Sequence, residues 1–479
     1  MAGFGNLLGF GLGNRAMSFH AGGRYLVIGL GRTGLPTVDV LRSQGAQVVA
    51  TDEKDPPTMR DVVSRVEAAG ARFCDPAALM TVLPHIDTAV LSPGVPRSGA
   101  LVRSILAAGI PIISEIEVAY QLCKAPIIAV TGTKGKSTVT ALAAHLFAAA
   151  GKNVLAGGNI GNALIKEAVS ASKDDWVIAE ISSFQLESIR DFRPRISVLL
   201  NIAPDHLDRY DSMDEYAAAK YRIFENQDRS DIFIGNLEDP RILALYPERG
   251  TRRVRAQTLW FTAGGAHREL ASLFAYDGTI WRAREPGGDA AQVMRCSDIP
   301  LPGTHNVENV LAALSIAFAA GCDPAGLGAA ITRFRGMPHR LQTIAEIGGT
   351  RYVDDSKATN PAAVIAALHA FAGGLVLIAG GKSKRTDFRQ MGQAISARAK
   401  SVVLFGEAAD EIAASIAGPP IERASSMDDA VVRAARAAQA GDVVLLSPGC
   451  ASFDMFDSAE HRGDVFAACV QALGAVARA

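Results

Sequence analysis

Residues 126–138 have the sequence PIIAVTGTKGKST, an apolar run followed directly by a glycine-rich turn that ends in Gly-Lys-Ser. A strand that enters a helix through such a turn presents backbone N–H groups and a lysine to bound phosphate. The turn is shorter than a full phosphate loop, because Val130 stands where the first glycine belongs. We still expect a nucleotide site here, with Lys136 on the phosphates and Ser137 on Mg²⁺.

The same pattern of strand, turn and helix recurs along the chain. Helical stretches of ten or more residues separate the apolar runs, which predicts parallel sheets and hence an α/β fold. Between 251 and 300, paired glycines and isolated aromatic residues predict a small antiparallel section instead. The runs that predict buried strands are 25–29, 47–51, 88–92, 110–113, 126–132, 176–182, 196–201, 375–381, 401–406 and 442–449.

Length and composition limit the class of protein. A chain of 479 residues is long enough for about three domains. Its 48 Lys and Arg against 49 Asp and Glu give a net charge of −1, so we expect no nucleic-acid surface. No apolar run reaches the roughly 18 residues of a membrane span. Six scattered cysteines without a Cys-x-x-Cys pair predict neither a zinc ribbon nor a disulfide framework, as in a cytoplasmic protein.

The first twenty residues stand apart from this pattern. They are glycine-rich and apolar but lack the early basic residues of a signal peptide. We expect residues 1–20 to be a disordered leader or to precede the true start, for which Met17 is a candidate.

A second glycine-rich turn, GLGRTG at 29–34, follows a strand and opens a helix. Asp52 ends the next strand, about twenty residues after Gly31, which is the spacing of dinucleotide-binding folds. The glycines let backbone N–H groups approach a diphosphate at the helix N-terminus. The geometry suits any nucleotide diphosphate, NAD included, and a simple tight turn is the alternative.

Three polar residues in the middle of the chain are candidate members of a catalytic site. Glu180 lies in the apolar run near the phosphate loop, where a carboxylate can hold Mg²⁺. His206 lies between two aspartates in the segment NIAPDHLDRY. Lys220 follows on a predicted helix, where a lone lysine usually lies on a solvated face.

Together these motifs resemble the Mur ligases of peptidoglycan synthesis. The matching segments occur in the family's order over about 25–463. They are GLGRTG (29–34), GTKGKST (132–138), GGNIGNAL (157–164), AEISSFQLE (179–187), NIAPDHLDRY (201–210), GTHNVEN (303–309), MPHR (337–340), DDSKATN (354–360) and SPGCASFD (447–454). Within the family, SSFQLE, DHLDRY and DSKATN are typical of the member that adds D-glutamate.

The resemblance implies a three-domain Mur ligase architecture. A Rossmann-like N-terminal domain would bind UDP over 21–114. A central domain like a phosphate-loop ATPase would span 115–336. A Rossmann-like C-terminal domain would bind ATP and glutamate over 337–479. We expect the protein to be a monomer.

The resemblance also implies an activity. ATP would phosphorylate the carboxylate of UDP-N-acetylmuramoyl-L-alanine, and the amine of D-glutamate would attack the acyl phosphate, releasing ADP and phosphate. Lys136 and two Mg²⁺ ions would neutralise the phosphates. Ser137 and Glu180 would hold one ion, and His206 and Lys220 the other, with Lys220 carbamylated by CO₂. Carbamylation turns an ammonium that repels Mg²⁺ into an oxygen ligand, so it reverses the expectation of a solvated lysine.

The family's binding residues carry over position by position. The ATP site would comprise Gly132, Thr133, Lys134, Gly135, Lys136, Ser137, Thr138, Asn309, Arg340, Asp355 and Lys357. The site for the UDP substrate would comprise Gly31, Arg32, Thr33, Asp52, Ser92, Gly94, Asn159, Ser182 and His206. The glutamate site would comprise Thr359, Lys384 and Ser452. The turn at 29–34 would then serve UDP rather than NAD.

Two departures from the family's pattern lie on the amino-acid side. Ser458 and Ala459 stand where an aromatic residue is usual, and extra basic residues leave open whether Lys382 or Lys384 contacts glutamate. The sequence also leaves open an L-glutamate-adding relative and a non-catalytic module that binds UDP-muramoyl peptides. A folate polyglutamate synthetase would lack the UDP-binding unit, and an NAD-dependent oxidoreductase would lack the second phosphate loop.

Overall fold

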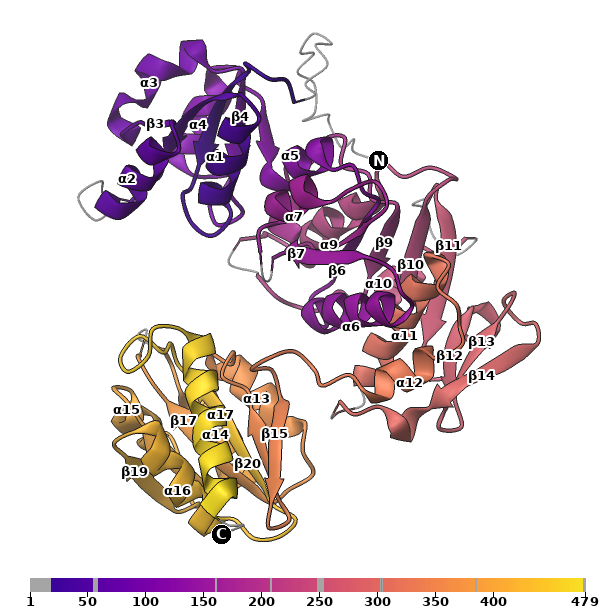
Figure 1. Ribbon diagram of the computed structural model, residues 1–479, viewed down its shortest axis with the longest axis vertical. Coiled ribbons are helices and arrows are strands. Elements are labelled where there is room, and N and C mark those ends of the chain that lie inside the picture. The colour runs from indigo at the N-terminus through magenta and orange to yellow at the C-terminus, as the bar shows by residue number, and fades with distance from the viewer. Residues whose placement is uncertain are drawn as a thin grey trace, which may run out of the picture. The chain divides into compact units, whose positions relative to one another are not determined.

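The computed structural model describes residues 19–54, 59–159, 162–206, 209–247, 254–301, 303, 305–383 and 386–476 (Figure 1). Residues 1–18 of the expected leader (1–20) lie outside this part of the chain, whereas Phe19 and His20 are described, and the Phe19 N–H donates to Gln121 Oε1 at 2.7 Å. By contacts the chain forms two compact units. The first consists of Met1–Thr133, Asn153–Phe233 and Arg253–Gln257, and the second of Lys134–Lys152, Ile234–Arg252 and Thr258–Ala479.

The N-terminal sheet consists of five parallel strands in the order β3-β2-β1-β4-β5. The strand order reverses between β1 and β4, as in doubly wound folds, whose ligands bind at the carboxyl ends of the strands. The Rossmann-like expectation is therefore confirmed for this region. The elements are β1 (Arg24–Ile28), α1 (Gly34–Ser43), β2 (Gln47–Thr51), α2 (Arg60–Ala68), β3 (Arg72–Phe73), α3 (Leu79–Val82), β4 (Thr88–Leu91), α4 (Ala100–Ala107) and β5 (Ile112–Ser114).

The middle sheet has nine strands in the order β14-β13-β12-β11-β10-β9-β6-β8-β7. All five residues of β6 are buried, and β6 pairs in parallel with both β8 and β9. The predicted antiparallel section is confirmed for β12, β13 and β14, although β11 pairs with β12 in parallel. The strands are β6 (Ile127–Thr131), β7 (Val154–Gly158), β8 (Trp176–Glu180), β9 (Ile196–Leu199), β10 (Ile232–Asn236), β11 (Gln257–Thr262), β12 (Leu273–Tyr276), β13 (Thr279–Ala283) and β14 (Ala290–Arg295).

Eight helices belong to the same stretch of chain among the described residues. The phosphate-loop helix α6 begins directly at the lysine of Gly-Lys-Ser. The helices are α5 (Glu115–Leu122), α6 (Lys136–Ala149), α7 (Leu164–Ser170), α8 (Ser183–Leu186), α9 (Met213–Tyr221), α10 (Pro240–Leu243), α11 (His305–Ala319) and α12 (Leu327–Thr332).

The C-terminal sheet has six strands in the order β15-β16-β20-β17-β18-β19, antiparallel only between β15 and β16. Successive residues of its strand β17 point to opposite faces of the sheet. Leu375 and Leu377 pack with α13 and α14, while Val376 and Ile378 pack with α16 and α17, so helices cover both faces. The elements are β15 (Gln342–Ile347), β16 (Thr350–Asp354), α13 (Pro361–His369), β17 (Leu375–Gly380), α14 (Arg389–Arg398), β18 (Ala399–Phe405), α15 (Ala409–Ala413), β19 (Ile421–Ala424), α16 (Met427–Ala437), β20 (Val443–Gly449) and α17 (Ala459–Val476).

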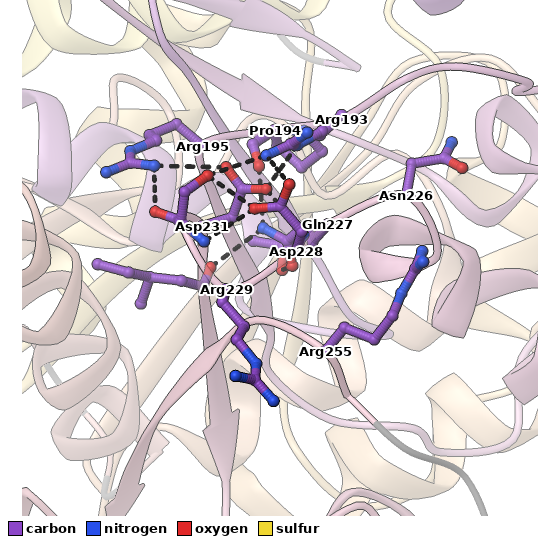
Figure 2. Close-up of polar contacts among 12 residues, drawn as sticks. Arg193, Pro194, Arg195, Asn226, Gln227, Asp228, Arg229, Asp231 and Arg255 are labelled. Carbon is purple, nitrogen blue, oxygen red and sulfur yellow. Dashed lines mark hydrogen bonds and ion pairs between the residues drawn. The ribbon is translucent and has the colours of Figure 1, made fainter.

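A polar network ties the segment before β9 to the segment before β10 (Figure 2). The buried Asp231 accepts a hydrogen bond from Arg193 at 2.6 Å, and Arg193 also pairs with Asp228 at 2.7 Å. Gln227 Nε2 donates to the Pro194 carbonyl at 2.9 Å. These contacts lie at the amino end of β9, whereas ligand sites of parallel sheets lie at the carboxyl ends. We therefore interpret the network as structural.

Two further findings concern the cysteines and the helices of the described residues. All six cysteines are free, so the structure contains no disulfide bond among them. None of the helices described combines the length and the apolar character that crossing a membrane requires.

Candidate nucleotide and substrate site

The turn at 29–34 has the backbone geometry that a diphosphate site needs. Gly29 has a φ of +84°, and a Cβ at Gly34 would overlap the Gly29 carbonyl oxygen, so both positions favour glycine. A Cβ at Gly31 would meet nothing within 4 Å, so this side of the turn is open. Helix α1 follows, with Thr33 at its N-cap. The positive end of the helix dipole therefore lies at the turn.

Two residues predicted to contact UDP hold the turn itself. The Asp52 carboxylate accepts a hydrogen bond from the Leu30 N–H at 2.6 Å, and the Ser92 hydroxyl donates to the Gly29 carbonyl at 2.7 Å. Ser92 follows β4 directly, and the exposed Gly94 lies two residues further on. The structure thus brings this part of the predicted UDP set together at the carboxyl end of the sheet.

Arg32 reaches from this turn to the loop after β7. Its guanidinium donates to the Asn159 carbonyl, and to the Gly158 carbonyl at 3.4 Å. The Asn159 side chain in turn donates to a Glu180 carboxylate oxygen at 2.9 Å. Arg32 is thus linked through Asn159, a residue of the predicted UDP-substrate set, to a predicted metal ligand.

The phosphate loop connects β6 with α6. Gly135 adopts a φ of +84° directly before the helix, and Lys136 and Ser137 are the first two helical residues. The first N–H groups of a helix lack partners within it, and together with the helix dipole they favour a bound phosphate. Thr133 is held from the side of β9, because its N–H donates to the Asn201 carbonyl at 3.0 Å.

Lys220 is buried beside the phosphate loop. Only 1% of the residue is exposed, and its Nζ donates to the Gly132 carbonyl oxygen at 2.8 Å. The ammonium also lies 4.6 Å from the centre of the Tyr216 ring. A solvated position, the usual expectation for a lone helical lysine, is wrong for this residue.

Ser182 caps the N-terminus of α8 in a capping box with Gln185. The Ser182 N–H and hydroxyl donate to Gln185 Oε1 at 2.8 and 3.0 Å, and the Gln185 N–H donates to the Ser182 hydroxyl at 3.3 Å. Gln185 Nε2 donates to the buried Glu115 at 2.8 Å. Burial raises the pKa of Glu115 to about 7. The sequence placed Gln185 in a motif but offered no sign that Glu115 supports it.

His206 has a left-handed backbone conformation, with a φ of +54°. This conformation is uncommon for residues other than glycine. Here the His206 carbonyl accepts hydrogen bonds from the N–H groups of Arg209 at 3.0 Å and Tyr210 at 3.2 Å. The imidazole packs against the edge of the Phe184 ring at a centroid distance of 4.7 Å. Its side chain is 44% exposed and therefore accessible to a ligand.

Glu187 connects the two long motifs around α8. Its carboxylate accepts hydrogen bonds from Arg209 at 2.9 Å and from the Tyr210 hydroxyl at 2.6 Å. Burial and this contact raise the pKa of Tyr210, so the hydroxyl stays protonated and donates. The Arg209 guanidinium lies 3.9 Å from the centre of the Phe184 ring and donates to the Pro93 carbonyl at 3.0 Å. The motifs were visible in the sequence, but nothing there gave these residues a role.

The predicted Mg²⁺ ligands differ in how well they fit a cation. Ser137 and Glu180 offer a hydroxyl and a carboxylate oxygen, which are donors that Mg²⁺ prefers. Lys220 as an ammonium is no ligand, since its Nζ donates to a carbonyl, so it would fit only after carbamylation. Within the described residues, no three side chains of His, Cys, Asp or Glu gather as a metal site. Phosphate oxygens of a bound nucleotide would have to complete the coordination.

Within the second unit, a cavity of about 240 Å³ gathers several predicted ATP residues. The predicted residues in its lining are Thr138, Arg340, Asp355 and Lys357. Asn306 also lines it, and the predicted Asn309 lies one turn further along α11. The Asn309 side chain donates to Asn306 Oδ1 at 2.7 Å, so Asn309 orients a lining residue.

Asp355 is buried in the wall of this cavity. The Ser447 hydroxyl donates to it at 2.9 Å, and the Leu341 N–H donates at 3.3 Å. Burial raises the pKa of Asp355 to about 7. Lys357 forms an ion pair with Glu460, the second residue of α17, which sequence reasoning did not single out. The lysine would have to leave or share this carboxylate to meet a phosphate.

Arg462 joins the two loops on which the predicted glutamate residues lie. It is completely buried and donates to the Ser356 hydroxyl at 2.9 Å, the Ser356 carbonyl at 2.8 Å and the Cys450 carbonyl at 3.1 Å. Burial lowers the pKa of Arg462 to about 10, so it remains a cation at neutral pH. Thr359 and the buried Ser452 follow in the same two loops.

The two candidate lysines for glutamate binding are described unequally. Lys384 lies outside the described residues. The Lys382 N–H donates to the Ala451 carbonyl at 2.8 Å, next to Ser452. The choice between the two side chains therefore stays a prediction.

Three family profiles match consecutive parts of the chain. A profile described as Mur ligase MurD-like, N-terminal domain matches residues 23–114. One described as Mur ligase middle domain matches residues 130–317, and one described as Mur ligase, glutamate ligase domain matches residues 339–450. The three matches follow the order of the three sheets.

Similar proteins match over nearly the whole chain. The UDP-N-acetylmuramoylalanine--D-glutamate ligase of Pelotomaculum thermopropionicum is 42% identical over 94% of this chain and 98% of its own length. The ligase of the same name from Koribacter versatilis is 40% identical over 93% of this chain and 96% of its own length. The parallel sheets and the phosphate loop define an α/β nucleotide-binding protein. Because the family profiles and the relatives match over most of its length, the chain belongs to the Mur ligase family.

Solved structures share the same fold. UDP-N-acetylmuramate-alanine ligase MurC from Thermotoga maritima superposes with a TM-score of 0.56 at 19% identity, covering 94% of this chain and 99% of that one. MurF from Acinetobacter baumannii gives a TM-score of 0.57 at 18% identity, covering 89% and 91%. At these identities the likeness concerns the fold, and it confirms the expected three-domain Mur ligase architecture.

Proposed function

We propose that this protein joins D-glutamate to UDP-N-acetylmuramoyl-L-alanine in peptidoglycan precursor synthesis, with ATP cleaved to ADP and phosphate. The observation that carries the proposal is the near full-length similarity, at 42% and 40% identity, to relatives named for this activity. The phosphate loop and the buried Lys220 beside it also support the proposal, because the reaction requires a bound ATP.

The reaction needs two transfers at one carboxylate. A carboxylate oxygen of the L-alanine residue attacks the γ-phosphorus of ATP, and ADP leaves. The uncharged amine of D-glutamate then attacks the acyl carbon, phosphate leaves with the bonding electron pair, and the nitrogen loses a proton to become an amide. Both steps depend on positioning and on compensation of phosphate charge.

Residues of the first unit are proposed to hold the UDP substrate and the reacting carboxylate. The turn at 29–34 with Asp52, Ser92 and Gly94 would bind the uridine diphosphate portion. Asn159 and Ser182 would lie along the muramoyl portion, and His206 at the reacting end. Arg32 supports this assignment, because it links the turn to the Asn159 loop.

The phosphate loop is proposed to bind ATP together with the cavity of the second unit. Lys136 and the N–H groups at the start of α6 would neutralise the terminal phosphates. Arg340, Asp355 and Lys357 line the cavity of about 240 Å³ and would bind the remainder of the nucleotide. Thr359, Lys384 and Ser452 would bind the carboxylates of D-glutamate.

Magnesium and a modified lysine complete the proposal. Mg²⁺ would supply charge compensation at the phosphates, with Ser137 and Glu180 as oxygen donors for one ion. For the second, the uncharged amine of Lys220 would add to CO₂ and lose a proton to give a carbamate, which with His206 would offer anionic oxygen and nitrogen donors. The burial of Lys220 beside the loop supports this, because a carbamate needs protection from water.

Phosphate release tests the proposed function. We expect turnover only when ATP, Mg²⁺, UDP-N-acetylmuramoyl-L-alanine and D-glutamate are all present, and none when any one is left out. Equal or faster turnover with L-glutamate would overturn the stereochemical assignment. Tight binding of the UDP substrate without phosphate release for any amino acid would instead identify a binding module.

A further inference from the structure

We infer that Arg209 is a positioning residue that couples the loop after β4 to the placement of His206. The inference rests on the proposed function, in which Ser92 and Gly94 of that loop bind UDP and His206 lies at the reacting carboxylate. Arg209 belongs to neither proposed group of contact residues. Its contacts nevertheless reach both.

The first contact is on the UDP side. Arg209 Nη1 donates to the Pro93 carbonyl at 3.0 Å. Pro93 stands between Ser92 and Gly94, and the Ser92 hydroxyl donates to the Gly29 carbonyl of the glycine-rich turn. A ligand that orders the turn and this loop therefore also fixes the Pro93 carbonyl, to which Arg209 donates.

The second contact is on the side of His206. The Arg209 N–H donates to the carbonyl of His206, which has a left-handed backbone, at 3.0 Å. The guanidinium lies over one ring, Phe184, at 3.9 Å, and the His206 imidazole packs against the same ring at 4.7 Å. Arg209 thus constrains both the backbone and the imidazole of His206.

A third contact keeps the guanidinium in place. Arg209 Nη2 donates to Glu187 at 2.9 Å, and the Tyr210 hydroxyl holds the second carboxylate oxygen at 2.6 Å. The side chains of Arg209 and Glu187 are 17% and 13% exposed. A charge-assisted hydrogen bond with so little exposure to water is stronger than one at the surface, so it fixes the position of the guanidinium.

Only an arginine can satisfy this arrangement. Its planar guanidinium donates through two nitrogens to Pro93 and Glu187 while its face covers Phe184. A lysine keeps the positive charge and can pair with Glu187, but it offers one nitrogen and no planar face. Arg209→Lys therefore removes the coupling while keeping the charge of the pair.

Arg97 provides a matched control. Its Nη1 donates to the Glu187 carbonyl and to the Ser188 hydroxyl at 3.0 Å, so it joins the same two regions of chain. It has no contact with Phe184 or His206 among those the structure records. Arg97→Lys tests whether any loosening between these regions produces the same effect. Phe184→Leu, which removes the shared ring without changing charge, serves as a second variant should Arg209→Lys fold poorly.

Two measurements decide the inference. In steady-state kinetics, Arg209→Lys and Phe184→Leu should raise the KM for UDP-N-acetylmuramoyl-L-alanine about tenfold and lower kcat, with the KM for ATP unchanged within twofold. Arg97→Lys should stay within twofold of wild type throughout. In hydrogen exchange without ATP, the UDP substrate should slow exchange around His206 in wild type and in Arg97→Lys but not in the other two variants.

The outcomes separate this inference from the proposed function. Failure of the proposed function would appear in the wild-type protein as absent phosphate release, while the exchange measurement would still report on coupling. Three results would overturn the coupling itself. They are wild-type behaviour of Arg209→Lys in both measurements, an equal effect of Arg97→Lys, and no slowing of exchange around His206 in wild type.

Discussion

The Nζ of Lys220 lies 2.8 Å from the Gly132 carbonyl oxygen, so a lysine of α9 contacts the first glycine of the phosphate loop. A buried ammonium at this place holds the loop by a hydrogen bond. A carbamate there would instead turn an anionic oxygen toward the phosphates and their cations. The two forms predict different consequences when the side chain is removed.

Lys220→Ala should be nearly inactive, with a loss of kcat of about a hundredfold to a thousandfold, since a lost charge-stabilising group costs this order. If the working form is a carbamate, short-chain carboxylates should restore part of the activity by filling the vacated space. Lys166→Ala, at an exposed position of α7, is the matched control and should behave as wild type. Full activity of Lys220→Ala would remove Lys220 from the mechanism, and inactivity without rescue would leave only the hydrogen bond to Gly132.

Two glycines of the N-terminal turn should separate folding from binding. A methyl group at Gly34 overlaps the Gly29 carbonyl oxygen, so Gly34→Ala should lower the free energy of unfolding by about 2 kcal/mol or more. A methyl group at Gly31 meets nothing within 4 Å, so Gly31→Ala should fold normally. If UDP lies on this side of the turn, however, Gly31→Ala should raise the KM for the UDP substrate at least tenfold. Thermal unfolding and steady-state kinetics of both variants test this, and a normal KM for Gly31→Ala would exclude ligand contact at Gly31.

The sequence predicted correctly those parts of the fold that depend on neighbouring residues, such as the glycine-rich turns and the buried strands. The turns at 29–34 and 132–138 were placed correctly, because glycine conformation and helix N-termini are properties of neighbouring residues. The apolar run 375–381 was likewise placed correctly as a buried strand, β17. The antiparallel section was predicted, but the parallel pairing of β11 with β12 was not, since pairing is a long-range property.

The supporting residues of the site depend on contacts between distant segments. Glu115 lies 70 positions from Gln185, and Arg462 lies 106 positions from Ser356. No periodicity or spacing connects such pairs. Lys220 shows the same limit, because a helical lysine has no sequence feature that reveals burial, and only the family resemblance pointed to the loop.

Arg462 should be critical for stability. Replacing it by methionine keeps much of its volume but removes the donor to the hydroxyl and the carbonyl of Ser356, at a cost of about 3 kcal/mol or more. Arg398 is a suitable control, because it also donates to two carbonyls, those of Leu368 and Phe371, but is only half-buried. Arg398→Met should cost about 1 kcal/mol. Denaturant unfolding measures both, and equal losses would show that the burial of Arg462 is not decisive.

The buried carboxyl of Glu115 should make stability depend on pH near neutrality. Burial raises its pKa from 4.5 to about 7, so between these values the folded state binds more protons than the unfolded state. Its contribution is fully present below pH 4.5 and is lost as pH rises through 7, a change of at most about 3 kcal/mol. Glu115→Gln keeps an acceptor for Gln185 and removes the titration. The positive charge of Arg32 lowers the pKa of Glu115 and is present in both proteins. Asp355, whose pKa is also raised to about 7, is present in both as well.

The measurement is the difference in unfolding free energy between Glu115→Gln and wild type from pH 5 to pH 8. This difference should move in favour of the variant as pH rises and level off above pH 7, because only the wild-type side chain must ionise in a buried site. Taking the difference cancels the titration of Asp355. A difference that is constant with pH would mean that Glu115 is already ionised in the folded protein, with the Gln185 hydrogen bond and Arg32 compensating its burial.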